Sequence, residues 1–138
     1  MAIEQGLTTS FKQEMLQAQQ NLASDTLYIA LYSGMANIGP NTTEYTALNE
    51  ITGTGYDAGG KELTGATIKA ASNGTVYVNF SDVIWPASYL TARGALIYNV
   101  TRSNKSVAVL NFGSDKTMSD FKIVMPVDAA STALIRFP

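Results

Sequence analysis

The chain has 138 residues with no cysteine and no histidine, and nine basic against eleven acidic residues give a net charge of −2. This length predicts one domain with a core of its own. The missing histidine and cysteine exclude Ser-His and Cys-His nucleophile pairs and ordinary zinc sites. Nucleic-acid partners are not expected, because binding them requires a clustered basic face.

The first residues, 1–9, are predicted to form an N-terminal arm ahead of a single domain over 10–138. The arm contains Glu4 and lacks the apolar run that is typical of a secretory signal. No apolar stretch anywhere approaches the ~18 residues that a membrane span needs, so no membrane partner is expected.

A helix is predicted over 10–22. Four apolar residues recur at helical spacing and share one face: Phe11, Met15, Ala18 and Leu22. Ser10 and Gln13 fit a capping box at its start. The apolar face can dock on its own domain or on a neighbouring subunit, so Phe11 and Met15 are candidate interface residues.

From residue 25 onward the pattern changes to strands. Residues 25–33 alternate between two apolar faces, with Leu27, Ile29 and Leu31 on one and Tyr28, Ala30 and Tyr32 on the other. A polar stretch follows over 34–60, and a loop this long is usually functional or gains order from a partner.

The second half predicts two hairpins. Asn73-Gly74 indicates a type I′ turn inside the first, over 62–80. The second joins 94–100 to 106–113, and two closing strands flank a turn at 128–131. Trp85 is predicted to fill one end of the core. About seven strands after one N-terminal helix predict a mainly β antiparallel sandwich, Ig-like or jelly-roll-like.

The stretch EITGTGYDAGG, residues 50–60, holds four glycines in eight positions. A phosphate-binding P-loop requires a hydroxyl residue after Gly60-Lys61, and Glu62 stands there instead. We therefore interpret these glycines as allowing tight turns and close backbone approach. Tyr56, among them, is either an exposed recognition side chain or a plug on the sheet edge.

Catalytic and metal chemistry find little support in the sequence. Four loop acids could pair as glycosidase carboxylates, although solvated loop charges are the favoured interpretation: Glu44, Glu50, Asp57 and Glu62. Asp115 and Asp120 could bind a hard cation, but they lack the dense acidic spacing of a calcium loop. No enzyme activity, cofactor or metal is expected.

Tyrosines and one arginine complete the candidate interface residues. Tyrosine suits half-buried sheet faces and is also enriched in protein interfaces, so Tyr45 and Tyr56 are candidates beside Phe11 and Met15. Arg93 is a lone charge entering an apolar strand, where it can pair across an interface or on its own sheet.

Several blocks, in order, resemble a group of small structural proteins of tailed-bacteriophage virions. The blocks are SFKQEML, DTLYIALYS, NEITGTGYDAGG, TARGALIYN, VAVLNFGSDK and a last strand ending in ALIRF. They extend from about residue 10 to residue 137, and it is their combination that is specific.

The resemblance implies a head decoration, or cement, protein without catalytic residues. Its expected partner is the major capsid protein, together with further copies of itself, for example as trimers. It implies a location on the capsid surface of the virion, after synthesis in the host cytoplasm. A tail, adaptor or fibre component and a carbohydrate-binding or host-surface module remain the alternatives.

Overall fold

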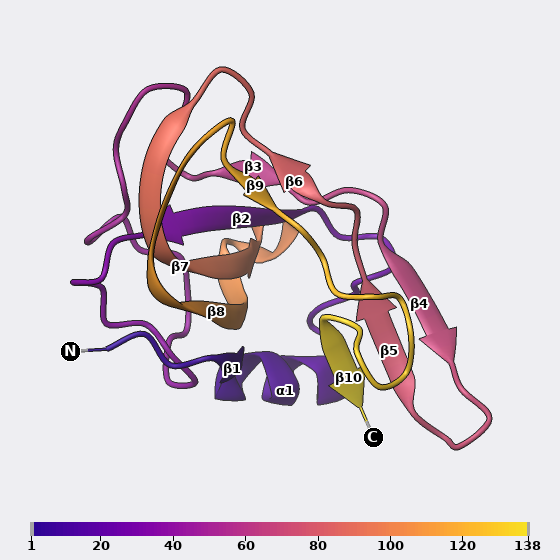
Figure 1. Cartoon of the computed structure of the whole chain (residues 1–138). Coiled ribbons are helices and arrows are strands. Elements are labelled where there is room, and N and C mark those ends of the chain that lie inside the picture. The colour runs from indigo at the N-terminus through magenta and orange to yellow at the C-terminus, as the bar shows by residue number, and fades with distance from the viewer. Residues whose placement is uncertain (1, 138) are drawn as a thin grey trace.

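The computed structural model describes residues 2–137 and shows a mainly β fold with antiparallel sheets and one α-helix (Figure 1). The largest sheet has five strands, in the order β1 (Gly6–Leu7), β8 (Lys105–Ser119), β7 (Tyr89–Asn99), β2 (Leu27–Tyr32) and β3 (Lys61–Glu62). A second sheet has the order β10 (Ile135–Phe137), β5 (Val76–Asn79) and β4 (Thr67–Ala70). A third pairs β6 (Val83–Ile84) with β9 (Lys122–Ile123).

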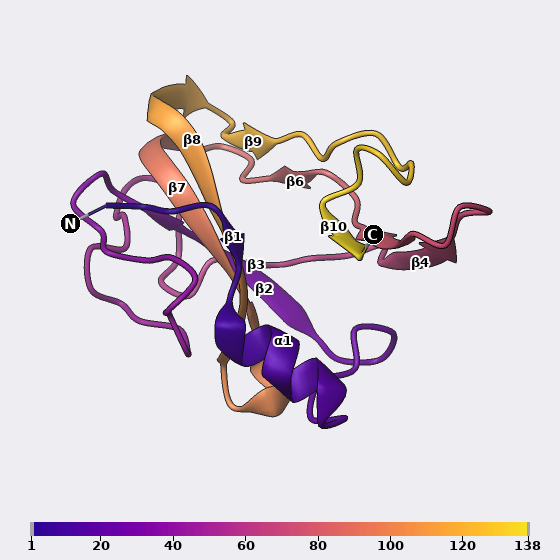
Figure 2. The same cartoon turned by 90° about the horizontal axis from the view of Figure 1, so that it is seen from below.

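The predicted sandwich is confirmed, with ten strands over residues 2–137 instead of about seven. Five of the ten are only two or three residues long, so they are too short for an alternating pattern to mark them in the sequence. The second and third sheets lie opposite the five-stranded sheet (Figure 2).

The two faces of the five-stranded sheet are both buried. We call one the front face, where Leu27, Ile29 and Leu31 of β2 pack in a core that also contains Val78 of β5 and Ile123 of β9. The opposite, rear face carries the alternate residues of the same strands: Ala30, Tyr32, Leu96, Tyr98 and Val109. The predicted alternation of β2 is confirmed.

The rear face is covered by the long loop between β2 and β3. Ala36 and Ile38 of this loop are buried against the sheet, and Tyr45 packs partly buried beside them. Backbone bridges tie the loop down, at Glu50 to Tyr32 and at Glu44 to Lys105. The loop is therefore ordered by its own domain.

The helix, α1, covers Thr9–Leu16 and is shorter than the predicted 10–22. Its N-cap is Thr8, whose Oγ1 accepts from the backbone N–H of Phe11 at 3.2 Å, so the predicted cap at Ser10 was wrong. Ser10 Oγ instead lies 3.2 Å from Ser106 Oγ of β8. In the part of the chain that the structure describes, no helix is long and apolar enough to cross a membrane.

Side-chain hydrogen bonds hold the residues that follow the helix. Gln20 donates to Glu14 Oε1 at 2.8 Å and to the carbonyl of Ser106 at 3.3 Å. Ala18 has a left-handed φ of 57°, which breaks the helical path. Leu22 still reaches the front core, although it does so from an irregular segment.

The predicted N-terminal arm joins the sheet over the residues described. Gly6 and Leu7 pair with Val109 and Ala108 of β8. Ile3 bridges Ile38 in parallel orientation and is buried on the rear face. Residues 2–7 therefore belong to the domain that they were expected to precede.

The β4–β5 hairpin is confirmed, but its turn is not type I′. Gly74 has a φ of 93°, whereas Asn73 has no positive φ. Gly74 N donates to the carbonyl of Ala71 at 3.0 Å, and Ala71 N donates to the carbonyl of Thr75 at 2.8 Å. This pattern is a type I turn followed by a left-handed glycine that forms a bulge.

The β7–β8 hairpin is also confirmed and extends well beyond the predicted segments. Its register is irregular where Ala92 faces Lys116 but Gly94 faces Asn111, so that Arg93 alone lies opposite residues 112–115. Trp85 is buried in the front core, as predicted.

Candidate functional site

An apolar groove of about 410 Å³ lies between the second half of β8, β9 and the segment that follows β9. Its apolar lining consists of Leu110, Phe112, Met118, Phe121, Ile123, Val124, Met125, Pro126 and Leu134. Val124 is 69% exposed, so part of this lining faces solvent. A concave apolar surface of this kind is typical of a binding site.

A second hollow of about 240 Å³ continues the first toward β1. The two share Gln5, Leu110, Pro126 and Leu134, and the second adds Gly6 and Leu7 of β1. We call the combined feature the C-terminal groove. It extends from the far end of β8 to the edge strand of the five-stranded sheet.

The charged side chains that line the C-terminal groove are all basic: Lys116, Lys122 and Arg136. Lys122 Nζ lies 3.8 Å from Asp82, but both side chains are well exposed and such pairs are weak. Arg136 donates to the carbonyl of Ser131 at 2.9 Å. The groove therefore combines an apolar floor with a cationic rim.

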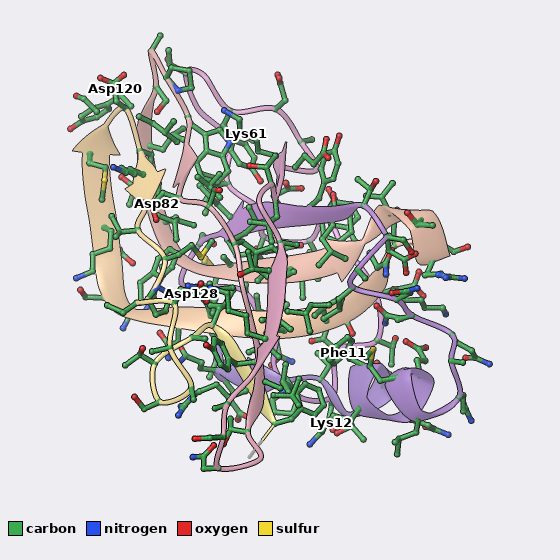
Figure 3. The ribbon with its side chains drawn as sticks, turned by 90° about the vertical axis from the view of Figure 1, so that its right-hand side faces the viewer. Phe11, Lys12, Lys61, Asp82, Asp120 and Asp128 are labelled. Atoms are coloured by element: carbon green, nitrogen blue, oxygen red, sulfur yellow. The ribbon has the colours of Figure 1, made fainter. Side chains whose placement is uncertain are left out.

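Single side chains, and not a strand, hold the wall of this groove in place. Asn79 of β5 donates to the carbonyl of Pro126 at 2.7 Å and accepts from the N–H of Leu134 at 3.4 Å. Asp82 Oδ1 accepts from the N–H of Met125 at 2.7 Å. Figure 3 labels Asp82 near β9 and Asp128 on the segment that follows β9.

Phe11 and Met15 dock on their own domain. Phe11 is fully buried in the front core, and Met15 packs partly buried against the same cluster. Figure 3 places Phe11 on the side of α1 that faces the sheet and Lys12 on the other side. The apolar helix face was expected to dock either on its own domain or on a neighbouring subunit. The structure shows that it docks on its own domain.

Tyr45 and Tyr56 both bind the carboxylate of Glu50. The Tyr45 hydroxyl donates to Glu50 Oε1, while Glu50 Oε2 accepts from the Tyr56 hydroxyl at 2.5 Å and from the N–H of Gly59 at 2.8 Å. Tyr56 also accepts from the N–H of Leu31 at 2.9 Å. We call Glu50, Tyr45, Tyr56 and Gly59 the Glu50 latch, because they fasten the long loop to the sheet, with Tyr45 packed on the rear face and Tyr56 against the front core.

Electrostatics keep the phenols of the latch protonated. Burial, followed by the hydrogen bond to Glu50, raises the pKa of both Tyr45 and Tyr56 far above the ordinary value for tyrosine. Burial and the nearby Glu50 charge raise the pKa of Tyr98 to about 12. Tyr98 donates to the carbonyl of Gly59 at 2.5 Å, so its neutral hydroxyl extends the latch.

The Glu50 latch bears on the glycosidase interpretation of the loop acids, which was the less favoured one. Both oxygens of Glu50 are occupied by donors, so neither is free to take a proton from a substrate. Asp57 is exposed and outside the latch, as are Glu44 and Glu62. Within residues 2–137, no three of these acids gather at one site.

Two glycines of the 50–60 stretch confirm the prediction of close backbone approach. A Cβ on Gly60 would overlap the carbonyl of Ile29, and one on Gly55 would lie 2.8 Å from Ser88 Cα. Both have left-handed backbones, with φ of 83° and 82°. Tyr56, next to Gly55, was expected to be either an exposed recognition side chain or a plug on the sheet edge. The structure favours the plug, because Tyr56 packs against the front core near Trp85.

Arg93 pairs on its own sheet. Its guanidinium donates to Asp115 Oδ1 at 3.5 Å and to the carbonyl of Gly113 at 3.3 Å across the irregular stretch of β8.

The two acids considered for a cation site have other partners. Asp115 pairs with Arg93, and Asp120 accepts from the N–H of Ala87 at 2.8 Å. Within residues 2–137, no three acidic side chains gather as metal ligands would.

Asp25 anchors the irregular segment that follows α1. Its Oδ2 accepts from Arg102 Nε at 2.9 Å, from Asn99 Nδ2 at 2.9 Å and from the N–H of Asn21 at 2.8 Å. Burial by itself raises the pKa of Asp25, but these hydrogen bonds, that of Arg102 first, outweigh it and hold the pKa below the ordinary value.

A separate polar hollow of about 430 Å³ lies between residues 2–4 and 37–46. Amides, hydroxyls and two carboxylates line it, together with Ile38 and Pro40: Glu4, Asn37, Asn41, Thr42, Thr43, Glu44 and Thr46. These groups are suited to binding hydroxyl-rich ligands.

Comparison of the chain with protein-family models, with curated proteins and with solved structures finds no match. Functional inference therefore rests on the residues themselves.

The C-terminal groove was missed by the sequence prediction, although a signal for it exists. In DFKIVMP the buried residues alternate with exposed ones, and one of the exposed residues is Val124. An outward-facing valine beside a lysine, in a strand pattern that ends at proline, indicates an apolar surface with a basic border.

Proposed function

We propose that this chain is a non-enzymatic structural protein of a tailed-bacteriophage virion that binds the outer surface of the major capsid protein lattice and stabilises the head. Two things support the proposal. The ordered blocks of sequence resemble virion proteins of this kind, and the C-terminal groove offers a surface for binding another protein.

The observation that carries the proposal is the composition of the C-terminal groove. Its apolar floor fits side chains such as leucine or valine, while Lys116, Lys122 and Arg136 favour carboxylates near them. The proposed occupant is an apolar, acidic segment of the major capsid protein. Each copy then needs an interface on the order of 1,600 Å² in total.

Binding of this kind stabilises the head by mass action. A ligand that binds the assembled lattice, and not its separated subunits, shifts the equilibrium toward the lattice. Repetition over many lattice sites multiplies a modest affinity at each site. No bond has to be made or broken.

A pair of valine variants tests the proposal. Val124 lines the groove and is 69% exposed, whereas Val127 is 73% exposed and lines neither hollow. We expect Val124→Asp to reduce cosedimentation with phage heads lacking this protein at least about tenfold, and Val127→Asp to leave it unchanged. Equal binding by both variants, or failure of the wild-type chain to bind heads, would refute the proposal.

The alternative virion roles differ from decoration in copy number. Quantitative gel analysis of intact particles, with location by electron cryomicroscopy, separates them. A copy number that follows the capsid subunits supports decoration, whereas copies confined to one vertex or to the tail support a tail, adaptor or fibre role.

The polar hollow favours a second candidate function, recognition of a carbohydrate on the host surface. Its amides, hydroxyls and carboxylates are able to bind sugar hydroxyls. Under this alternative, the chain binds members of a glycan array and loses that binding in Asn41→Ala. A blank array argues against it.

A further inference from the structure

Strand β4, Thr67–Ala70, is an edge strand of the three-stranded sheet. Its one neighbour within residues 2–137 is β5, and all four of its residues are exposed. Figure 1 and Figure 2 both place β4 at the outer border of the molecule, away from the five-stranded sheet. An exposed edge of this kind is a template for pairing with another strand.

The hydrogen bonds of the hairpin fix which residues of β4 face outward. Ala71 donates to the carbonyl of Thr75, so residues at even steps from Ala71 turn their backbone groups toward β5. These are Lys69 and Thr67. The N–H and C=O groups of Ile68 and Ala70 therefore point to the open edge.

The same alternation divides the side chains of this sheet between two faces. Ile68 shares a row with Val78 and Ile135, and both of these are buried in the front core. Ile68 itself is 48% exposed, although it belongs to the same apolar face. The apolar face thus continues past the core and stops at the open edge.

We propose that β4 pairs antiparallel with β4 of a second copy of this chain about a two-fold axis at Ile68. In that register Ile68 of each copy lies opposite Ile68 of the other, and Thr67 lies opposite Lys69. The outward N–H and C=O groups of the two Ile68 residues bond to each other, and the apolar face becomes continuous across both sheets.

Charge selects this register over the neighbouring one. An axis at Lys69 would also satisfy the outward backbone groups, but it would place the two Lys69 side chains directly opposite, where like charges are destabilising. With the axis at Ile68, each Lys69 faces a threonine and keeps its bond to Asp128 of its own chain, at 2.5 Å.

The contact is expected to be weak in solution and effective on a lattice. A pairing of four-residue strands belongs to the small class of interfaces, below about 1,200 Å², which are transient. Lattice sites hold copies at effective concentrations that reach the millimolar range. In this respect the inference rests on the proposed virion role, whereas the contact itself can be tested without particles.

Disulfide trapping tests the register directly, because the chain contains no cysteine of its own. Directly opposite residues of a hydrogen-bonded pair have Cα atoms about 5.5 Å apart, which a disulfide can bridge. We expect purified Ile68→Cys to form a covalent dimer on mild oxidation, at least about fivefold more than Ala70→Cys, which keeps Lys69 and lies opposite itself in neither register. Mixing Thr67→Cys with Lys69→Cys should yield the heterodimer.

Leu48→Cys, 73% exposed and on the long loop between β2 and β3, measures chance collision. A dimer yield from Ile68→Cys no higher than from Leu48→Cys would overturn the proposal. A dominant heterodimer from a mixture of Ile68→Cys and Ala70→Cys, which lie opposite each other when the axis is at Lys69, would overturn its register. Neither result affects binding to heads, which the Val124 and Val127 variants assess separately.

Sedimentation of variants without cysteine gives an independent measurement. The wild-type chain should show a rise in mean sedimentation coefficient with concentration. Ile68→Lys, which would place two added ammonium groups opposite each other, should abolish that rise. Its thermal unfolding should match the wild type, because Ile68 is half-exposed. A rise that persists in Ile68→Lys would contradict the proposal.

Discussion

The two faces of the five-stranded sheet are buried by different means. The front face meets two further sheets and α1, and its core consists almost entirely of apolar side chains. The rear face meets an irregular loop, which contributes few apolar residues and depends on the Glu50 latch. One face of the sheet is thus covered by packed strands and a helix, and the other by a loop that hydrogen bonds hold in place.

This difference shows that one charged side chain can hold a loop over a sheet face that would otherwise need a helix or a second sheet to cover it. Hydrogen bonds to a charged group contribute about 1.5–3 kcal/mol each, against 0.5–1.5 kcal/mol for neutral ones. Glu50 accepts three such bonds from residues spread over the loop. Disturbing the loop should therefore affect the rear face before the front face.

The largest effect is expected at Gly60, where loop and sheet meet. In Gly60→Ala the new methyl group would overlap the carbonyl of Ile29, and we expect a loss of more than about 4 kcal/mol in unfolding free energy. Gly74→Ala is the matched control, since its φ of 93° is similar but no atom lies within 4 Å. It should lose only about 1–2 kcal/mol. Equal losses in urea unfolding would contradict the close approach.

Alkaline titration should break the rear cover cooperatively. The pKa of Tyr98 is raised to about 12, and burial with the Glu50 charge raises the pKa values of Tyr32, Tyr45 and Tyr56 further. These neutral phenols therefore contribute fully to the stability of the folded state below pH 10, where unfolded tyrosines are also neutral. Their contribution is lost as the pH rises beyond that. A tenfold difference in acidity between the folded and unfolded phenol corresponds to about 1.4 kcal/mol.

Absorbance of tyrosinate and circular dichroism should then change together above pH 10. Ionisation of all seven tyrosines while the fold remains intact would show that the phenols of the latch are not buried donors.

Glu50→Gln should weaken the latch by about 2–3 kcal/mol, because an amide has one acceptor where the carboxylate has two. Hydrogen exchange should accelerate most at the N–H groups of Gly59 and Leu31, with less change in the β7–β8 pair. Glu44→Gln, at an exposed acid of the same loop, serves as control. Uniform acceleration across both faces would mean that the two covers unfold as one.

Asp25→Asn should cost about 1–2 kcal/mol at neutral pH, because charge-assisted bonds to Arg102 and Asn99 weaken. The folded pKa of Asp25 lies below the ordinary 3.8, so its contribution is present above that pH and disappears as pH falls below it. The difference between wild type and variant should narrow below about pH 4. Asp57→Asn, at an exposed acid, serves as the control.

The smallest effect is expected for Arg93→Ala, at the irregular stretch of β8. Its ion pair with Asp115 is exposed at both ends, so we expect a loss below about 1 kcal/mol that shrinks further in high salt. A loss that is larger and independent of salt would show that Arg93 contributes through packing against the loop residue Gly34.

The sequence predicted the parts of the fold that rest on local pattern. Alternation in β2 placed its side chains on the correct faces, because successive residues of a strand point to opposite sides. The glycines at 55 and 60 marked close backbone approach. The end of α1 was not predictable in this way, since the residues beyond it contact distant parts of the fold, as Gln20 does when it donates to β8.

The site depended on distant contacts that no local pattern encodes. Tyr45 and Tyr56 were recognised as important residues, but their shared ligand, Glu50, was grouped with solvated loop charges. The C-terminal groove forms only when Asn79 holds the segment around Pro126 and Leu134. Its residues are far apart in the chain, and their juxtaposition follows from the complete fold.

The pairing of β2 with β7 has a consequence for how the chain acquires its structure. Leu27 pairs with Asn99, about half the chain away, whereas β7 and β8 are joined by a short turn. Sheets with such long-range pairing assemble slowly, on a scale of milliseconds to seconds. We therefore expect the β7–β8 hairpin to organise first. During synthesis on the ribosome, β2 emerges early, apolar on both sides, and is the segment most open to capture by a chaperone.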